Sequence, residues 1–179
     1  MRSAIATLMI MAAVGGAQAG PIADSVAQVP VSLPAALDVV TATIGSKITH
    51  LEFESRDGVP TYEFIVETAA DVYYVGVSGT TGLVTEVDVI ADDDDARFKA
   101  LAKISEDDAK AAAMANYKGE VEEVKRLLLS DGTAAFEVDV EITGAGGEYN
   151  VYVDAASGKV KLVNVEYWEL GETVPGDAD

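Results

Sequence analysis

Cysteine is absent from the 179-residue chain, and histidine occurs only once, as His50. Without cysteine the chain can form no disulfide bond and cannot accept the lipid of a bacterial lipoprotein, so its fold must be held by packed apolar surface. With one histidine, a Ser-His-Asp triad or a histidine-rich metal site would depend on that residue alone. His50 lies in the alternating segment KITHLEFES, which favours a histidine on a strand surface instead.

Basic residues are scarce: 12 lysines and arginines face 31 aspartates and glutamates, which gives a net charge of −19. A field of this sign repels nucleic acids and anionic membranes, so neither is expected as a partner. A basic protein surface or a cation would be attracted. Solubility alone also explains the acidity, without any specific electrostatic role.

Long apolar runs are missing outside the N-terminus. Residues 1–19 have the three parts of a secretory signal: Arg2, an apolar run from Ala4 to Val14, and Ala17-Gln18-Ala19. That run is too short to span a bilayer, and no later segment approaches the roughly 18 to 20 apolar residues required. We predict a signal peptide cleaved after Ala19, a periplasmic or secreted protein, and no membrane span after cleavage.

A fifteen-residue pattern occurs twice, as YYVGVSGTTGLVTEV at 73–87 and as YNVYVDAASGKVKLV at 149–163, with six identical positions. Upstream, the segment 57–68 aligns with 131–142, and two extra residues of the second copy fall in the glycine-rich loop 144–147. The chain is therefore predicted to contain one structural unit twice.

Each copy is predicted to open with an amphipathic helix. Ser32 and Ser105 suit the N-cap positions. The acids at 106–108 would lie at the N-terminus of the second helix, where the positive end of the helix dipole stabilises negative charge. Gly45 and Gly119 are predicted to close the two helical runs, and Gly119 is predicted to end the second helix in a left-handed conformation.

After each helix, apolar residues alternate with polar ones, as in FEVDVEI at 136–142. This period of two predicts strands with one buried and one solvated face, so Glu137, Asp139 and Glu141 are predicted to be exposed to solvent. In the repeated hairpin, the alternate side chains of Tyr-x-Val-x-Val are predicted to cover the helix. Tight turns are predicted at the Asp-Gly pairs 57–58 and 131–132, and another between Asp154 and Gly158.

The predicted fold is α+β with two repeats, each consisting of one helix packed on a small antiparallel sheet of about four strands. The predicted divisions are a signal peptide at 1–19, a first unit at 20–90, an acidic connecting segment with a short helix at 91–103, a second unit at 104–170, and a disordered acidic tail at 171–179. Docking between the units and the oligomeric state do not follow from the sequence.

No catalytic motif is found, so neither an enzyme nor a cofactor is predicted, and acids at alternating strand positions are interpreted as a solvated face. The run Asp92, Asp93, Asp94 and Asp95 is the one candidate metal site, because four carboxylates could bind Ca²⁺ weakly. It lacks the alternating ligands, the central glycine and the final glutamate of a calcium loop. Helix capping and solvation are the preferred explanation of this run.

Between Ile104 and about Val165, the second copy has Ile-Ser-x-x-x-Ala before the helix, a glycine after it, and Tyr-x-Val-x-Val-Asp-x-x-Ser-Gly-x-Val in the hairpin. In this motif the second copy resembles the PepSY domain family. The first copy, from 32 to about 87, is a degenerate version. The motif residues expected to be structurally important are Ser105, Gly119, Tyr149, Asp154 and Gly158.

The resemblance implies an α+β fold and a tendency to bind, and sometimes to restrain, another protein, often a peptidase. We therefore expect an exported, non-enzymatic protein that binds a partner, an exported peptidase with a basic surface for example, through an exposed sheet surface or an unpaired strand edge. The alternative is an acidic envelope protein that binds or buffers calcium.

Overall fold

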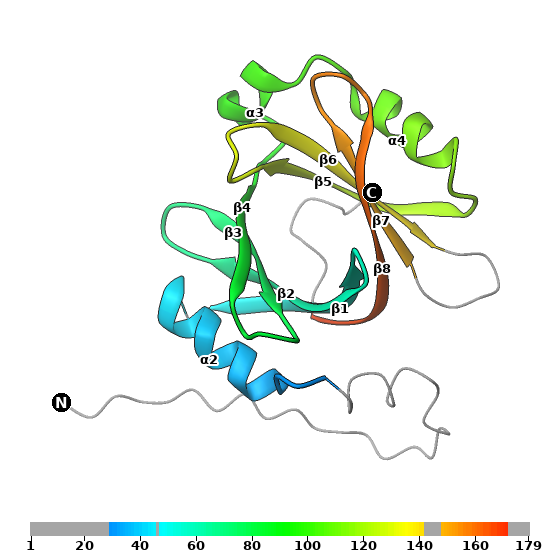
Figure 1. The fold of residues 1–179 in the computed structure, drawn as a ribbon. Helices are drawn as coiled ribbons and strands as arrows, with labels where there is room; N and C mark the ends of the chain where they lie inside the picture. Colours follow the sequence, from blue (N-terminus) through cyan, green and yellow to red (C-terminus); the bar gives the residue numbers. More distant parts are fainter. Residues whose placement is uncertain (1–28, 46, 142–147, 172–179) are drawn as a thin grey trace.

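The computed structural model describes residues 29–45, 47–141 and 148–171. Within them, eight antiparallel strands follow one another in chain order around a closed barrel, and the helices lie outside it (Figure 1). The elements are α2 (Leu33–Thr43), β1 (Ile48–Arg56), β2 (Val59–Glu67), β3 (Val72–Ser78), β4 (Val84–Ile90), α3 (Ala96–Leu101), α4 (Glu106–Met114), β5 (Glu120–Leu128), β6 (Ala134–Glu141), β7 (Glu148–Asp154) and β8 (Val160–Gly171).

A single sheet replaces the two sheets of about four strands that the sequence predicts. The α+β class is confirmed, and a helix followed by four strands does occur twice in the element order. However, β8 pairs with β1 from Arg56↔Asn164 to His50↔Gly171, and β4 pairs with β5, so the strands close into one barrel. Local patterns could not reveal these pairings, because they join strands distant in sequence.

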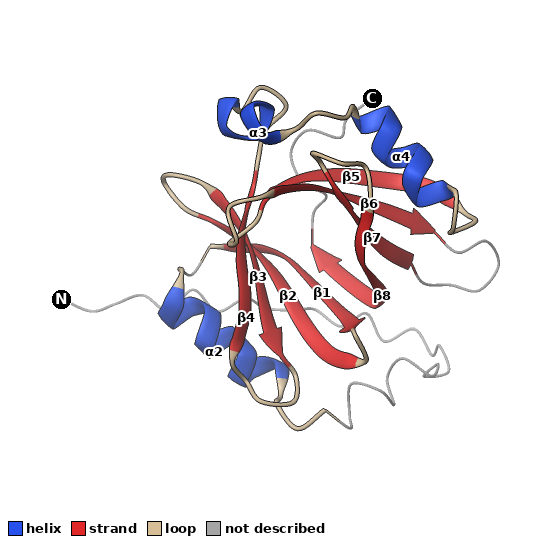
Figure 2. Ribbon diagram, turned by 45° about the horizontal axis from the view of Figure 1, so that its top comes forward, coloured by secondary structure: helices blue, strands red, loops and turns tan. Residues whose placement is uncertain are grey.

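The helices cover the outside of the barrel, as Figure 2 also shows. Ala36 and Val40 of α2 pack with the outward side chains of β1–β3, whereas Ala109 and Ala113 of α4 pack with those of β6 and β7. The repeated hairpin has its predicted role. Tyr73, Val75 and Val77 lie in the α2 cluster, and Tyr149, Val151 and Val153 lie in the α4 cluster.

The ends of the helices differ from the prediction. Helix α4 ends at Met114, and α2 ends at Thr43, so neither Gly119 nor Gly45 is the capping residue. Neither glycine has a positive φ. Gly119 is instead constrained by a close backbone approach, because a Cβ atom there would lie 1.9 Å from the carbonyl oxygen of Glu141.

The strand turns follow the prediction more closely. Asp57, Gly58, Gly132 and Gly158 all have positive φ, which glycine adopts without strain and aspartate tolerates. Helix α3 lies within the acidic connecting segment, where a short helix is expected. The signal peptide, the inserted loop 144–147, Ile142 and the acidic tail beyond 171 lie outside the described residues.

The two seams that close the barrel are unequal. Strands β1 and β8 pair along most of β1, whereas β4 and β5 share only Val89↔Leu128 and Ile90↔Leu127. Every described strand therefore has two neighbours, and the expected fully unpaired strand edge is not found among them. None of the described helices is long and apolar enough to cross a membrane.

Candidate functional site

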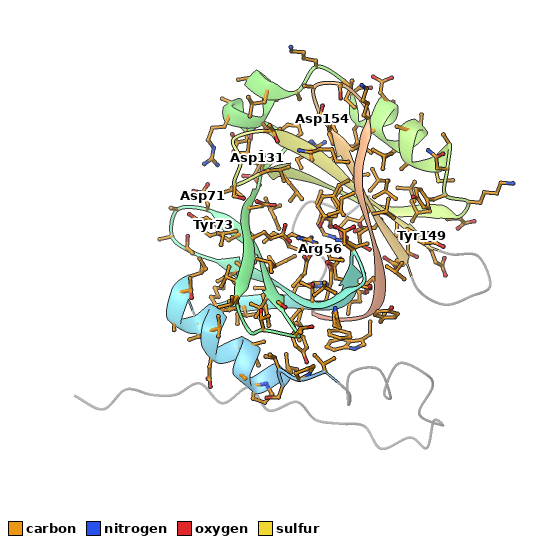
Figure 3. All side chains as sticks on the ribbon, viewed as in Figure 1. Arg56, Asp71, Tyr73, Asp131, Tyr149 and Asp154 are labelled. Atoms are coloured by element: carbon orange, nitrogen blue, oxygen red, sulfur yellow. The ribbon has the colours of Figure 1, made fainter. Side chains whose placement is uncertain are left out.

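The inside of the barrel is lined with charged side chains. Successive residues of a strand point to opposite faces, and in a closed barrel one of those faces is the interior. Glu52, Glu54, Glu63 and Glu137 are among the largest fully buried side chains of the protein. Figure 3 shows the Arg56 side chain within this ring of strands.

The prediction of a solvated strand face is wrong for Glu137 and Asp139 of β6, whereas Glu141 at the end of the strand is exposed as predicted. Glu137 is completely buried, and only 4% of Asp139 is exposed, although both alternate with apolar residues as predicted. Alternation distinguishes two faces of a strand, but a solvated face and a closed polar interior produce the same pattern. His50 is likewise buried instead of lying on a strand surface.

One group of buried carboxyls surrounds Arg56, at the end of β1. Arg56 Nη2 lies 2.6 Å from Glu63 Oε1, Nε lies 3.2 Å from Glu54 Oε1, and Nη1 pairs with Glu86 of β4. Nη2 also donates a hydrogen bond of 3.0 Å to the hydroxyl of Tyr152 on β7. This guanidinium thus connects strands from both halves of the barrel.

One guanidinium does not keep all three of these carboxyls ionised. Burial and the neighbouring Glu63 carboxyl raise the pKa of Glu54 well above its usual range, although Arg56 opposes this shift. The pKa of Glu63 is also raised by burial and by Glu86. This group therefore holds protons at a pH at which exposed glutamates would be ionised.

A second group surrounds Lys125, in the middle of β5. Lys125 Nζ lies 2.6 Å from Asp139 Oδ2, 3.2 Å from Glu137 Oε1 and 3.5 Å from Glu52 Oε1. Glu52 also accepts hydrogen bonds from the Tyr74 hydroxyl (2.7 Å) and from Asn150 Nδ2 (3.3 Å).

The proton affinities of this second group are divided. Burial alone would raise the pKa of Glu52, but the charges of Lys125 and His50 lower this pKa to about 2. Burial raises the pKa of Asp139, and the neighbouring Glu137 and Glu52 add to this shift. The Lys125 ammonium therefore stabilises the ionised form of Glu52, while the nearby Asp139 carboxyl has an increased proton affinity.

A third group of carboxyls lies at one end of the barrel, where β7 starts and β8 ends. His50 Nε2 is 3.2 Å from Glu52 Oε1 and 3.3 Å from Glu169 Oε2. Glu148 and Glu166 are direct cross-strand partners. Burial and nearby carboxyls raise the pKa of Glu148 to about 8 and that of Glu166 to about 9.

The barrel interior also has an apolar portion. Ile65, Tyr74, Leu127 and Tyr152 form a buried cluster, and they share strand faces with the interior carboxyls. The two tyrosines border both environments, because their rings pack in this cluster and their hydroxyls bond Glu52 and Arg56. The interior therefore places protonatable carboxyls and the cations Arg56 and Lys125 beside a buried apolar cluster.

The four aspartates of the candidate metal site do not form a ligand shell. Asp95 caps α3, where its carboxylate accepts a 2.7 Å bond from Arg97 N, and Asp93 pairs with Arg126. Asp92 and Asp94 are exposed. Across the described residues, no group of three or more histidines and acids has an arrangement that could hold a metal ion.

The five motif residues of the second copy have separate structural positions outside the barrel interior. Ser105 caps α4 in a reciprocal capping box with Asp108, and Tyr149 packs against Tyr117 with ring centroids 5.0 Å apart. Asp154 accepts a 2.7 Å hydrogen bond from Ser157 N in the β7–β8 turn, where Gly158 has a φ of 72°. Gly119 lies beside the backbone of β6.

Sequence reasoning missed the charged interior. One signal was available in the alternating pattern. Arg56 and Lys125 each lie two residues after an acid, Glu54 and Glu123, and therefore on the same face of the strand as that acid. A single basic residue on a strand face that otherwise carries acids can indicate an internal ion pair. The pairing across the barrel, however, is visible only in the fold.

Comparison with known proteins identifies one family. Residues 103–163 match the family model described as PepSY, peptidase propeptide and YPEB domain. No curated protein shows significant similarity to the chain. Among solved structures, a "putative lipoprotein" from Clostridium difficile 630 is 20% identical, with a TM-score of 0.34, and the match covers 66% of this chain and 82% of that chain. The match to the PepSY family model thus covers the segment 103–163, which includes α4 and β5–β7, where the sequence motif predicts the resemblance.

Proposed function

We propose that this protein is an exported, non-catalytic protein-binding module whose partner is a peptidase of the same compartment. The observation that carries the proposal is the PepSY match at 103–163, because this family is associated with peptidase propeptides and consists generally of non-catalytic regulatory modules. The signal-like N-terminal sequence supports export.

We place the main proposed contact on the outer surface of the barrel. Helix α4 is packed on β6 and β7 through Ala109 and Ala113, while Asp107 and Ala111 are exposed on its other side. Asp92 and Asp94, just before α3, are also exposed. This surface belongs largely to the PepSY segment, and a partner can contact it without opening the barrel.

Charge supports a basic partner surface. The net charge of −19 creates an attractive field for a basic protein, and exposed carboxylates accelerate association more than they slow dissociation. Because such charges are screened within about 8 Å at physiological ionic strength, the binding should weaken as salt is added.

The test is affinity capture with residues 20–179 from the envelope and secreted fractions of the native organism, at low and moderate salt, with mass spectrometry. Any captured peptidase is then purified and its activity and association rate are measured with increasing amounts of this protein. Enrichment of an exported peptidase that is bound directly is the expected result. Capture without a peptidase, or failure of the purified peptidase to bind, would overturn the proposal.

Two matched double variants locate the surface. Asp92→Asn with Asp94→Asn should slow association with the purified peptidase, because both charges lie next to the PepSY segment. Asp38→Asn with Asp57→Asn removes the same charge from the first half and should have a smaller effect. Equal slowing by both pairs would indicate a general effect of net charge and would contradict the proposed surface.

A further inference from the structure

Four carboxyls at one end of the barrel form a group that we call the acidic mouth: Glu122 of β5, Glu148 of β7, and Glu166 and Glu169 of β8. Glu148 and Glu166 face each other across the β7–β8 ladder, a position in which like charges are destabilising. Burial raises the pKa of Glu148, and the neighbouring Glu122 carboxyl adds to this shift. Glu122 and Glu169 are exposed, so the group is accessible from solvent.

The described residues place no lysine or arginine in an ion pair with this group. His50 contacts Glu169, but it also contacts Glu52, so one imidazole is shared between two carboxyls. Lys125 is surrounded by Asp139, Glu137 and Glu52, deeper in the barrel. Lys125 lowers the pKa of Glu148 and Glu166 only from a distance, so within the described residues Glu122, Glu148 and Glu166 make no ion pair with a lysine or arginine.

Two buried asparagines lie one layer deeper than the acidic mouth. Asn150 and Asn164 are cross-strand partners, two residues inward from Glu148 and Glu166 on the same face of β7 and β8. Both are completely buried. Neither side-chain polar atom of Asn164 has a hydrogen-bond partner, and Oδ1 of Asn150 has none. Buried polar groups are normally paired, so these free amide oxygens indicate a position for a donor.

The rest of the barrel shows which donor suits such a position. Where three carboxyls meet around Arg56, a basic side chain lies between them, and Lys125 does the same for Glu52, Glu137 and Asp139. The acidic mouth has the same chemistry but opens to solvent, so its cation can come from outside. Lysine suits a group of carboxyl and amide oxygens, because it has a compact ammonium with three donors on a four-carbon stem.

We propose that the acidic mouth is a binding site for a lysine side chain of a partner protein, whose ammonium lies between Glu148 and Glu166 and donates to the amide oxygens of Asn150 and Asn164. This inference rests on the proposed function and specifies the chemistry of the partner at one position. The raised pKa values of Glu148 and Glu166 agree with it, because an arriving ammonium would favour their ionised forms.

The test uses residues 20–179 and Nα-acetyl-lysine methylamide as the probe, observed by NMR through the side-chain amide signals of Asn150 and Asn164. The norleucine analogue, which has the same apolar stem without the charge, is the control probe. We expect saturable shifts with lysine and none with norleucine. Equal shifts with both probes would overturn the proposal, because the charge would then be irrelevant.

Two variants separate the site from the net charge. Glu166→Gln should weaken lysine binding by about tenfold or more, whereas Glu120→Gln, the same substitution at an exposed position on β5, should change it by less than about twofold. Glu166→Gln replaces a buried carboxyl with a raised pKa by a neutral amide of the same size and should fold. If it does not, Glu169→Gln at the exposed rim replaces it, with a smaller weakening expected. Equal weakening at position 120 would show non-specific attraction and overturn the proposal.

Two further probes decide between sources of positive charge. Calcium chloride that shifts the same signals and displaces lysine at lower concentration would overturn the proposal in favour of a metal site. A stronger response to the arginine analogue would overturn the preference for lysine. Neither probe involves a peptidase, so failure here is distinguishable from failure of the proposed function.

Discussion

Replacing Arg56 by methionine would remove the cation that lies among three buried carboxyls, with little change in side-chain volume. Arg56 contacts Glu54, Glu63 and Glu86, and both Glu54 and Glu63 are completely buried. Breaking a buried ion pair by removing one partner costs about 3 to 5 kcal/mol, against a total stability of about 5 to 15 kcal/mol for a typical domain. We therefore expect Arg56→Met to lose a large part of its free energy of unfolding at pH 8.

The pH dependence of this loss identifies its cause. The pKa values of Glu54 and Glu63 are already raised in the folded state, and without the guanidinium they would rise further. A carboxyl with a raised folded pKa contributes stability that is present at low pH and is lost as the pH rises through the folded pKa. The difference between Arg56→Met and the wild type should therefore shrink at pH 5, where more of these carboxyls are protonated.

The assay is urea unfolding of both proteins at pH 5 and pH 8, followed by circular dichroism. Arg97→Met is the matched control, because Arg97 is 54% exposed and its pairs with Asp71 and Asp95 are on the surface. That variant should lose much less stability than Arg56→Met, because ion pairs of an exposed arginine contribute little. A loss for Arg56→Met no larger than for Arg97→Met, or a loss equal at both pH values, would refute the buried-charge argument.

Three other predictions concern stability. Because the pKa of Glu166 is raised to about 9 and that of Glu148 to about 8, wild-type stability should fall between about pH 5 and pH 9. For Glu166 the slope is up to about 1.4 kcal/mol per pH unit, and a flat profile of urea midpoints would contradict it. Ser105→Ala should cost about 1 kcal/mol in urea unfolding, because it removes the capping box of α4. Gly119→Ala should cost about 1 to 3 kcal/mol because of the backbone of β6, while Gly45→Ala, with 3.9 Å to the nearest atom, should be nearly neutral in thermal unfolding.

Local features of the sequence determined the elements of this fold. Serine caps, an alternating pattern and Asp-Gly turns act between residues close in the chain, so the helices, hairpins and helix-covering role of Tyr-x-Val-x-Val could be predicted from them. The PepSY motif was recognisable for the same reason, since its residues cap a helix, shape a turn and pack one hairpin.

Only the tertiary structure decided where the acids lie. Glu137 and Asp139 have the same alternation whether their face meets solvent or the inside of a barrel, and closure depends on the pairing of β1 with β8, at opposite ends of the described chain. Once that pairing forms, carboxyls from β1, β6 and β8 are brought together around Lys125 and at the acidic mouth. The charged interior therefore results from long-range strand pairing, because the strands that supply its side chains meet only when the barrel closes.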